Sequence, residues 1–427
     1  MPAEDEIYQY STPCDHIEEA SFTSRNGERY WILHHPQNRT YIRLNENEYQ
    51  AWKRIREGKT QINLNSNLHE QSLLTSLHDE GFLQAGDHEN QQAGNKGRDE
   101  NWISHYWELC IPLPGMHILF DTVDRKIGRV LRSWWFPWIF SLICIFGLTY
   151  FLITEPLPSY PVLQGEDSQL ITVLSVYVIL ITAAILHVFG HALACKVYGR
   201  EIGDAGLLLY YGMPCLYIDT SDIWMADRRS RIIVSLAGPA VNLFIGSICA
   251  ILVMGFPDSD ASSLLWRVAF LSFAVALINL NPLLEFDGYY ALADLLEVPD
   301  LRERAFSFVR TWGSNRIRLS REGWFFLMYG TASAVCTLAI VVFGIYFWTE
   351  HMTDLITELG KDRWEMDHIL ATFAIVIVFV PFFAGMIISG TKTLMQKIGN
   401  PSGNGDNGVL QSEQVHEKRV LTRRISK

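Results

Sequence analysis

Two histidines four residues apart, His187 and His191, are the side chains in this sequence whose spacing points most directly to chemistry. On an α-helix, residues at positions i and i+4 lie on one face about 6 Å apart, so two imidazoles can converge on one metal ion. The residues around them are almost all apolar, which predicts a helix that crosses a membrane. A charged side chain costs at least about 2.5 kcal/mol in hydrocarbon, so ionisable groups there are expected to have a partner or a task. The pair therefore predicts a metal site within the membrane.

A third ligand is predicted farther along the chain, where another apolar stretch ends. Residues 281–288 read Asn-Pro-Leu-Leu-Glu-Phe-Asp-Gly. Proline removes a backbone donor and glycine permits a sharp bend, so Asp287 is expected on broken helix, where its carboxylate can turn inward. Counting residues along the two apolar stretches puts the histidines and Asp287 near the same, cytoplasmic boundary. Two imidazoles and one carboxylate leave a fourth position open, as in a catalytic zinc site, and suit zinc better than calcium or magnesium.

The apolar segments predict a multi-pass α-helical membrane protein with about six transmembrane helices, because each approaches the roughly 20 residues that cross a bilayer. The segments are residues 133–153, 170–194, 232–255, 264–284, 324–347 and 368–389. Lys and Arg gather in the loops on one side, which predicts that both termini are cytoplasmic. The expected location is the plasma or inner membrane of a bacterium, in contact with lipid. Residues 207–224 are expected to form either a re-entrant or interfacial hairpin or an ordinary cytosolic loop.

The first hundred residues are polar and acidic, with ten Lys and Arg against seventeen Asp and Glu, so no nucleic-acid partner is expected there. Residues 30–44 predict a β-hairpin, and helices are predicted over 46–57 and 69–80. This pattern indicates a small N-terminal α+β unit, which resembles a winged-helix domain. The predicted organisation is a tail over 1–27, the winged helix over 28–84, a linker over 85–109, the membrane domain over 110–398 and a disordered basic tail over 399–427.

Three motifs in order resemble the site-2 protease family of intramembrane zinc metallopeptidases. They are Leu-His-Val-Phe-Gly-His-Ala-Leu over 186–193, Ser-Leu-Ala-Gly-Pro-Ala-Val-Asn over 235–242, and Asn-Pro-Leu-Leu-Glu-Phe-Asp-Gly-Tyr-Tyr over 281–290. The similarity covers roughly residues 110–350. It implies that His187, His191 and Asp287 hold zinc, and that Asn281 and the loop from Leu207 help to seat an extended peptide, which commonly adds to a strand edge.

Val188 departs from the family pattern, because the resemblance implies a glutamate there that acts as general base. Without a base, a proton-transfer contribution of about 10²- to 10⁴-fold is lost. Zinc alone would still lower the pKa of its water toward about 7, so weak hydrolysis stays open. Glu285, Asp219 and Asp222 are the carboxylates nearest in sequence that could replace the base, and nothing in the sequence shows that any of them reaches the metal.

The N-terminal unit resembles the PqqD-like winged-helix domain, which grips a leader peptide in systems that modify peptides. This resemblance rests on the hairpin, on the helix that holds Tyr49 and Trp52, and on residues 81–83. A purely structural or regulatory cap remains an equal alternative. A peptide or protein substrate and an export or peptide-modification complex are the partners that the two resemblances imply.

Three hypotheses for the function follow. The first is a zinc-binding membrane protein that captures a peptide but is catalytically impaired by Val188. The second is an active intramembrane metallopeptidase in peptide maturation or export. The third is a membrane anchor or export-complex subunit that holds no metal.

Overall fold

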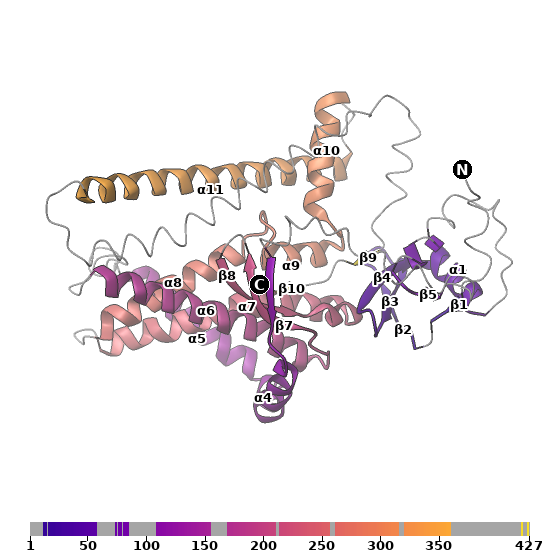
Figure 1. The fold of residues 1–427 in the computed structure, drawn as a ribbon, viewed down its shortest axis with the longest axis horizontal. Coiled ribbons are helices and arrows are strands. Elements are labelled where there is room, and N and C mark those ends of the chain that lie inside the picture. The colour runs from indigo at the N-terminus through magenta and orange to yellow at the C-terminus, as the bar shows by residue number, and fades with distance from the viewer. Residues whose placement is uncertain are drawn as a thin grey trace. The chain divides into compact units, whose positions relative to one another are not determined.

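The computed structural model describes residues 12–14, 16–57, 73–74, 76–78, 80–84, 108–154, 169–210, 213–256, 261–315, 320–359, 420–421 and 425–426. The chain divides into two compact units. Unit 1 comprises Met1–Leu109, Ser221–Asp227 and Met386–Ile425, and unit 2 comprises Cys110–Thr220, Arg228–Gly385 and Ser426–Lys427. Among the described residues, a small sheet and helix α1 characterise the first unit, and long helices make up most of the second (Figure 1).

An antiparallel sheet in the order β2-β3-β4-β9 forms the centre of unit 1. Its strands are β2 (Glu18–Thr23), β3 (Arg29–His35), β4 (Thr40–Asn45) and β9 (Val420–Leu421). Leu33 in β3 lies opposite Ile42 in β4, so the predicted hairpin is confirmed. β2 pairs with β3 although it lies in the residues that the sequence assigns to an N-terminal tail. Two short strands, β1 (Thr12–Pro13) and β5 (Leu83–Gln84), pair with each other.

The helix α1 (Glu46–Arg56) begins directly after β4 and covers one face of this sheet. A capping box starts it: the Asn45 side chain accepts from the backbone of Glu48, and the Glu48 side chain accepts from the backbone of Asn45. Trp52 packs with Leu33 and Ile42 in the core. The first predicted helix is thus confirmed. Half of the second, over 69–80, lies outside the described residues, and residues 73–74 and 76–78 are helical. The winged-helix assignment stays a prediction.

The other face of the sheet is covered by the short helix η2 (Ser221–Met225), which belongs to unit 1. Met225 and Trp224 pack against Tyr30, Ile32 and Tyr41. Both faces of the sheet therefore contribute to apolar cores, which removes apolar surface from water and stabilises the unit.

Unit 2 is built from helices. They are α4 (Met116–Leu131), α5 (Phe136–Ile153), α6 (Gln169–Val197), α7 (Arg228–Gly255), α8 (Ala261–Asn279), α9 (Asp287–Leu296), α10 (Leu301–Asn315) and α11 (Arg321–Leu359). Five of the described helices are long and apolar enough to cross a membrane: α5, α6, α7, α8 and α11. They correspond to the first five predicted segments. The sixth, over 368–389, lies outside the described residues.

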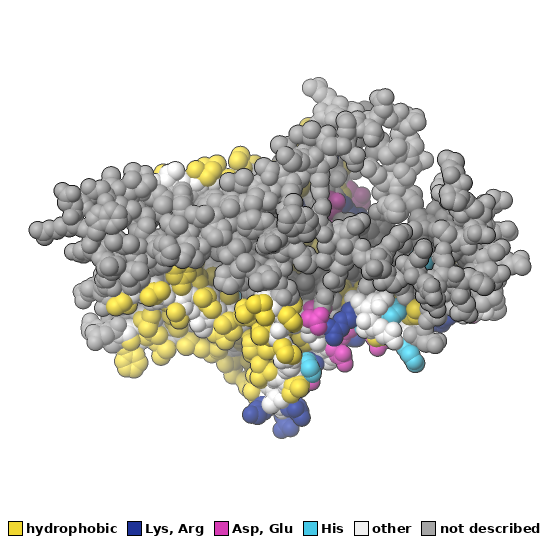
Figure 2. Space-filling view, viewed as in Figure 1, with side chains coloured by type: hydrophobic (Ala, Val, Ile, Leu, Met, Phe, Trp, Pro, Cys, Tyr) yellow, Lys and Arg dark blue, Asp and Glu magenta, His cyan; other side chains and the backbone are white. Residues whose placement is uncertain are grey.

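The outward-facing side chains of these helices are apolar. On α5, Trp138, Leu142 and Ile145 are 72 %, 67 % and 64 % exposed. Figure 2 shows hydrophobic side chains spread over a broad area of one face. Soluble monomers rarely expose such large apolar areas, and lipid is the solvent that would accept this one. The structure thus agrees with a membrane protein.

The central helix of unit 2 is α7, which packs against α5, α6, α8 and α9. It approaches α6 closely at Gly190, where an added Cβ would lie 2.8 Å from the carbonyl oxygen of Ala237. A larger residue at that position would push the two helices apart. Helix α6 carries the two predicted histidine ligands and α9 carries the predicted aspartate, so α7 lies against both elements that supply the site.

A second sheet has the strand order β10-β8-β7-β6. Two of its strands, β7 and β8, come between α6 and α7 in the chain. Its strands are β6 (Glu108–Pro112), β7 (Ala205–Tyr210), β8 (Met213–Asp219) and β10 (Ile425–Ser426). β7 and β8 pair antiparallel with Leu207 opposite Leu216, so this segment contains a β-hairpin, and a re-entrant or interfacial position for it stays a prediction. β9 and β10 are two short strands in the tail that the sequence predicts to be disordered.

Candidate metal centre

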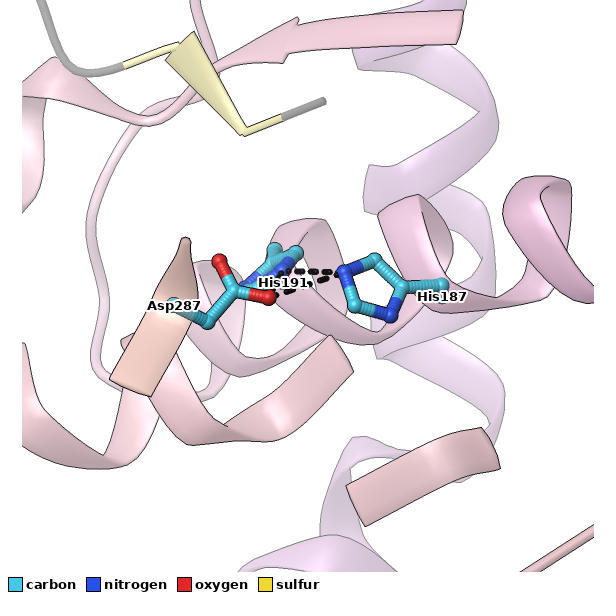
Figure 3. A group of neighbouring side chains, drawn as sticks. All are labelled: His187, His191 and Asp287. Carbon is cyan, nitrogen blue, oxygen red and sulfur yellow. Dashed lines mark hydrogen bonds and ion pairs between the residues drawn. The ribbon is translucent and has the colours of Figure 1, made fainter. Parts of the chain in front are cut away.

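The two histidines lie one helical turn apart on α6 and are buried. His187 is 2 % exposed and His191 is fully buried. Both point toward the same place, where Asp287 meets them (Figure 3). The i, i+4 spacing therefore produces the convergence that the sequence predicts.

Asp287 is the first residue of α9, and it follows a non-helical turn. Helix α8 ends at Asn279, five residues before the predicted end of this segment, because the chain turns at Asn281 and Pro282. The Asn281 Oδ1 atom accepts a hydrogen bond of 2.9 Å from the backbone of Leu283, a local bond that competes with helix. Gly288 then lies so close to the backbone that an added Cβ would be 2.2 Å from the carbonyl oxygen of Leu280. The broken helix predicted for Asp287 is confirmed.

The three candidate ligand atoms have the mutual spacing of a metal site. Nε2 of His187 lies 3.1 Å from Nε2 of His191 and 3.0 Å from Oδ2 of Asp287, and the distance from His191 Nε2 to Asp287 Oδ2 is 3.4 Å. Atoms about 2.05 Å from a tetrahedral zinc ion are about 3.3 Å from one another. The side chains are thus arranged so that one ion could contact all three.

The charge of Asp287 suits a cation. Burial by itself raises the pKa of its carboxyl, but the neighbouring imidazoles, His191 foremost, lower that pKa below its usual value. The side chain is only partly exposed, and an ionised carboxylate here would balance part of the charge of a bound cation.

Helix α7 leaves space for an ion at this point because residue 238 is glycine. A Cβ there would lie 2.3 Å from Nε2 of His191 and 2.6 Å from Nε2 of His187. Any larger residue would occupy the space between the imidazoles. The donor set and this open space both fit a bound zinc ion.

Two further contacts from α7 orient the imidazoles. His191 Nδ1 lies 2.7 Å from the carbonyl oxygen of Val234, so it donates, and Nε2 is left with its lone pair toward the site. His187 Nδ1 lies 3.0 Å from Nδ2 of Asn242, whose Oδ1 is buried without a hydrogen bond among the described residues. Exchanging the amide oxygen and nitrogen gives Oδ1 the His187 N–H as its donor and again frees Nε2.

Residue 188, where the family pattern requires a base, is a buried valine with 5 % exposure. None of the three carboxylates considered as substitutes belongs to the described group of His, Cys, Asp and Glu side chains that could share an ion, which is His187, His191 and Asp287. The Glu285 side chain is 57 % exposed, and its Oε1 lies 3.3 Å from Arg302.

The other two belong to different elements from the three candidate ligands. Asp219 is beside Gly203, where an added Cβ would be 2.5 Å from its Oδ2, and Asp222 lies in η2 of unit 1.

Asn281 has structural contacts. Besides its bond to Leu283, its Nδ2 lies 3.4 Å from Sγ of Cys336. A role in substrate binding stays a prediction.

Two residues that shape the site, Gly238 and Val234, cannot be recognised from the sequence alone. Gly238 lies inside the Gly-Pro motif of residues 235–242, but it matters because it has no side chain opposite the histidines. The Val234 contribution is a backbone carbonyl, which no side-chain pattern reveals.

The known proteins to which this chain is similar are named as zinc metalloproteases, which fits a zinc site. The chain is 29 % identical over 118 residues to a Bacillus subtilis protein named "Putative peptide zinc metalloprotease protein YydH", a match that covers 27 % of this chain and 45 % of that one. It is 33 % identical over 156 residues to "Putative zinc metalloprotease Rip2" of Mycolicibacterium smegmatis, covering 30 % and 59 %. The protein of the same name in Mycobacterium tuberculosis is 30 % identical over 160 residues, covering 30 % and 62 %.

In each case the match spans less than two thirds of the relative. No protein-family model matches the chain. No solved structure matches it. The chain is therefore a distant relative of proteins named as zinc metalloproteases.

Proposed function

We propose that this protein is a membrane-embedded zinc-binding protein of the site-2 protease type, which captures an extended peptide and cleaves it poorly or not at all. The observation that carries the proposal is the convergence of His187, His191 and Asp287 at mutual distances of 3.0 to 3.4 Å. Zinc is favoured because imidazole is a poor ligand for calcium and magnesium, which prefer oxygen.

The chemistry of such a site can be divided between the ion and the chain. Zinc with three protein ligands lowers the pKa of its water and polarises a carbonyl group. The chain itself orients the two imidazoles through Val234 and Asn242 and supplies the negative charge of Asp287. What it lacks is a proton acceptor at residue 188, because a valine side chain has none.

The peptide would come to the sheet that contains the hairpin of β7 and β8, which follows the histidine helix in the chain. An extended peptide adds to the edge of a sheet through backbone hydrogen bonds, and because β7 and β8 are inner strands of this sheet, the peptide would pair with an outer strand, β6 or β10. The PqqD-like reading gives the N-terminal unit a role in holding the same or another peptide. Membrane lipid and an export or peptide-modification complex complete the proposed partners.

The active-peptidase alternative has one observation in its favour, the names of the relatives. The residue at position 188 distinguishes the impaired protein from the active peptidase. If the wild-type chain cleaves peptide, and the His187→Ala variant does not, the site is active with a proton acceptor from elsewhere.

Zinc content tests the proposal. The full chain, purified in detergent, is expected to carry one zinc ion, and Asp287→Ala is expected to lose it. Glu285→Ala is the matched control, because it removes a carboxylate two residues away that faces Arg302 and lies outside the ligand group. If the wild-type protein contains no zinc, and if mutation of His187 leaves the fold unchanged, the metal-free anchor would be favoured.

A further inference from the structure

Two ion pairs connect α7 to α9, the helix whose first residue is Asp287. Arg231 Nε donates to Asp294 Oδ1 at 3.0 Å, and Arg228 Nη1 lies 3.5 Å from Glu297 Oε1. The two arginines are three residues apart, and so are the two acids, in the opposite sense along the chain. The first pair joins a face of α7 to α9, and the second joins the same helix to Glu297, the left-handed residue that directly follows α9.

Arg231 belongs to the face of α7 that orients the histidines. Positions 231, 234, 238 and 242 follow one another at spacings of three and four residues, so they form one stripe along the helix. Val234 and Asn242 contact the imidazoles, and Gly238 leaves the space between them. A single helix face thus contacts both histidines and also holds the helix that brings the third ligand.

Asp294 lies on the same helix as Asp287, so the position of Asp294 on α7 determines where Asp287 lies. The two aspartates are seven residues apart on α9, which is close to two helical turns and about 10.5 Å along the axis. Both therefore face the same side. If α9 slid by one residue, Asp287 would move about 1.5 Å along the axis and turn by about 100°, whereas metal–ligand distances tolerate about 0.2 Å.

The burial of this pair indicates a role in specifying register. The side chains of Arg231 and Asp294 are 5 % and 7 % exposed. Removing two such charges from water costs several kcal/mol for each ion, so well-packed apolar residues would hold two helices together at least as well. What an apolar contact lacks is direction, whereas a guanidinium and a carboxylate meet in one arrangement.

The turn that precedes Asp287 is held separately by another helix, α11. The Tyr329 hydroxyl donates to the carbonyl oxygen of Pro282 at 2.8 Å, and the Ser333 hydroxyl donates to that of Leu283 at 2.7 Å. Both residues are on α11. Because these bonds remain when the ion pair is removed, loss of the pair is expected to weaken metal binding without abolishing it.

We propose that Arg231 and Asp294 are positioning residues of the metal centre, which fix the register of α9 on α7 and so hold the Asp287 carboxylate against the two imidazoles. This inference rests on the proposed function, because it assumes that the centre binds zinc.

The test measures zinc affinity of the full detergent-purified chain by competition with a chromophoric chelator. Arg231→Gln is expected to weaken zinc binding by about tenfold or more, as loss of outer contacts of a metal site commonly does. Arg229→Gln is the matched control, because it makes the same change on an exposed neighbour in the same helix and is expected to leave affinity unchanged. The exchanged pair Arg231→Asp with Asp294→Arg restores the attraction, so it is expected to recover most of the affinity.

The melting temperature in excess chelator separates this role from general stability. A residue that only stabilises the fold would lower that temperature and leave zinc affinity as in the control. Equal affinity of Arg231→Gln and Arg229→Gln would overturn the inference while the proposed function stands. If Arg231→Gln does not fold, the exchanged pair decides: a folded exchange variant with wild-type affinity supports the inference, and a folded one without zinc binding overturns it. Wild-type protein that binds no zinc would refute the proposed function instead.

Discussion

Replacing Val188 by glutamate is predicted to create or greatly increase peptide cleavage. Residue 188 directly follows His187 on α6 and is 5 % exposed, so a carboxylate there is introduced next to a ligand and away from bulk water. A positioned general base contributes about 10²- to 10⁴-fold in rate. At about 1.36 kcal/mol for each factor of ten, this equals about 2.7 to 5.4 kcal/mol of transition-state stabilisation.

The same substitution has a structural cost, which the control must match. Glutamate is larger than valine, and overpacking a buried site typically costs about 1 to 3 kcal/mol. Val188→Gln has nearly the same volume as Val188→Glu but cannot take up a proton at neutral pH. The ratio of the two rates therefore reports the base alone, and both variants are expected to melt at a lower temperature than wild type.

The assay follows release of fluorescence from quenched, labelled casein by the detergent-purified chain with one equivalent of zinc. Cleavage by Val188→Glu at least about a hundredfold faster than by Val188→Gln, and abolished by His187→Ala in the same background, is the predicted result. Equal rates in two folded, zinc-loaded variants would refute the reasoning, because they would show that more than the base has been lost. Wild-type cleavage as fast as that of Val188→Glu would instead favour the active peptidase.

Three other predictions follow from contacts around the site. Gly238→Ala is expected to abolish zinc binding, measured as metal content, because its Cβ would lie 2.3 Å from Nε2 of His191. Gly255→Ala is the control on the same helix: no atom lies within 4 Å of the added Cβ, so this variant should retain the metal. Asn242→Leu is expected to weaken zinc binding by about 10- to 100-fold, since it removes the partner that orients His187; unchanged affinity in the chelator competition would show that the ring is oriented without it. Removing zinc with a chelator is expected to lower the melting temperature, because a ligand at about 100 times its dissociation constant stabilises the folded state by about 2.7 kcal/mol; a chelator effect of equal size in Asp287→Ala would rule out this centre as the cause.

The sequence predicts the convergence of His187, His191 and Asp287 well because the determining signals are local. Two histidines at helical spacing need only a helix to converge, and the pattern around Asp287 carries its own helix break in Pro282 and Gly288. The end of α8 at Asn279 was predicted five residues too late, because apolar residues continue to Leu284 while the Asn281 side chain already bonds to the backbone of the turn.

The contributions of α7 could not be predicted, because they are contacts between helices far apart in sequence. Nothing in the residues around Arg231 shows that Asp294, 63 positions later, lies within 3.0 Å. In unit 1, strand β2 was missed for a different reason. Its sequence, Glu-Glu-Ala-Ser-Phe-Thr, has little apolar alternation, and it becomes a strand through pairing with the strongly apolar β3.

X-ray absorption spectroscopy at the zinc edge tests the central claim most directly, because it reports the atoms bound to the metal in the purified, full-length chain. A first shell of nitrogen and oxygen at about 2.0 to 2.2 Å, with the outer scattering of two imidazole rings, is the predicted result. In Asp287→Ala the metal signal should be lost. A shell of sulfur at about 2.3 Å, or a zinc ion bound without imidazole, would contradict the claim that His187, His191 and Asp287 hold the ion.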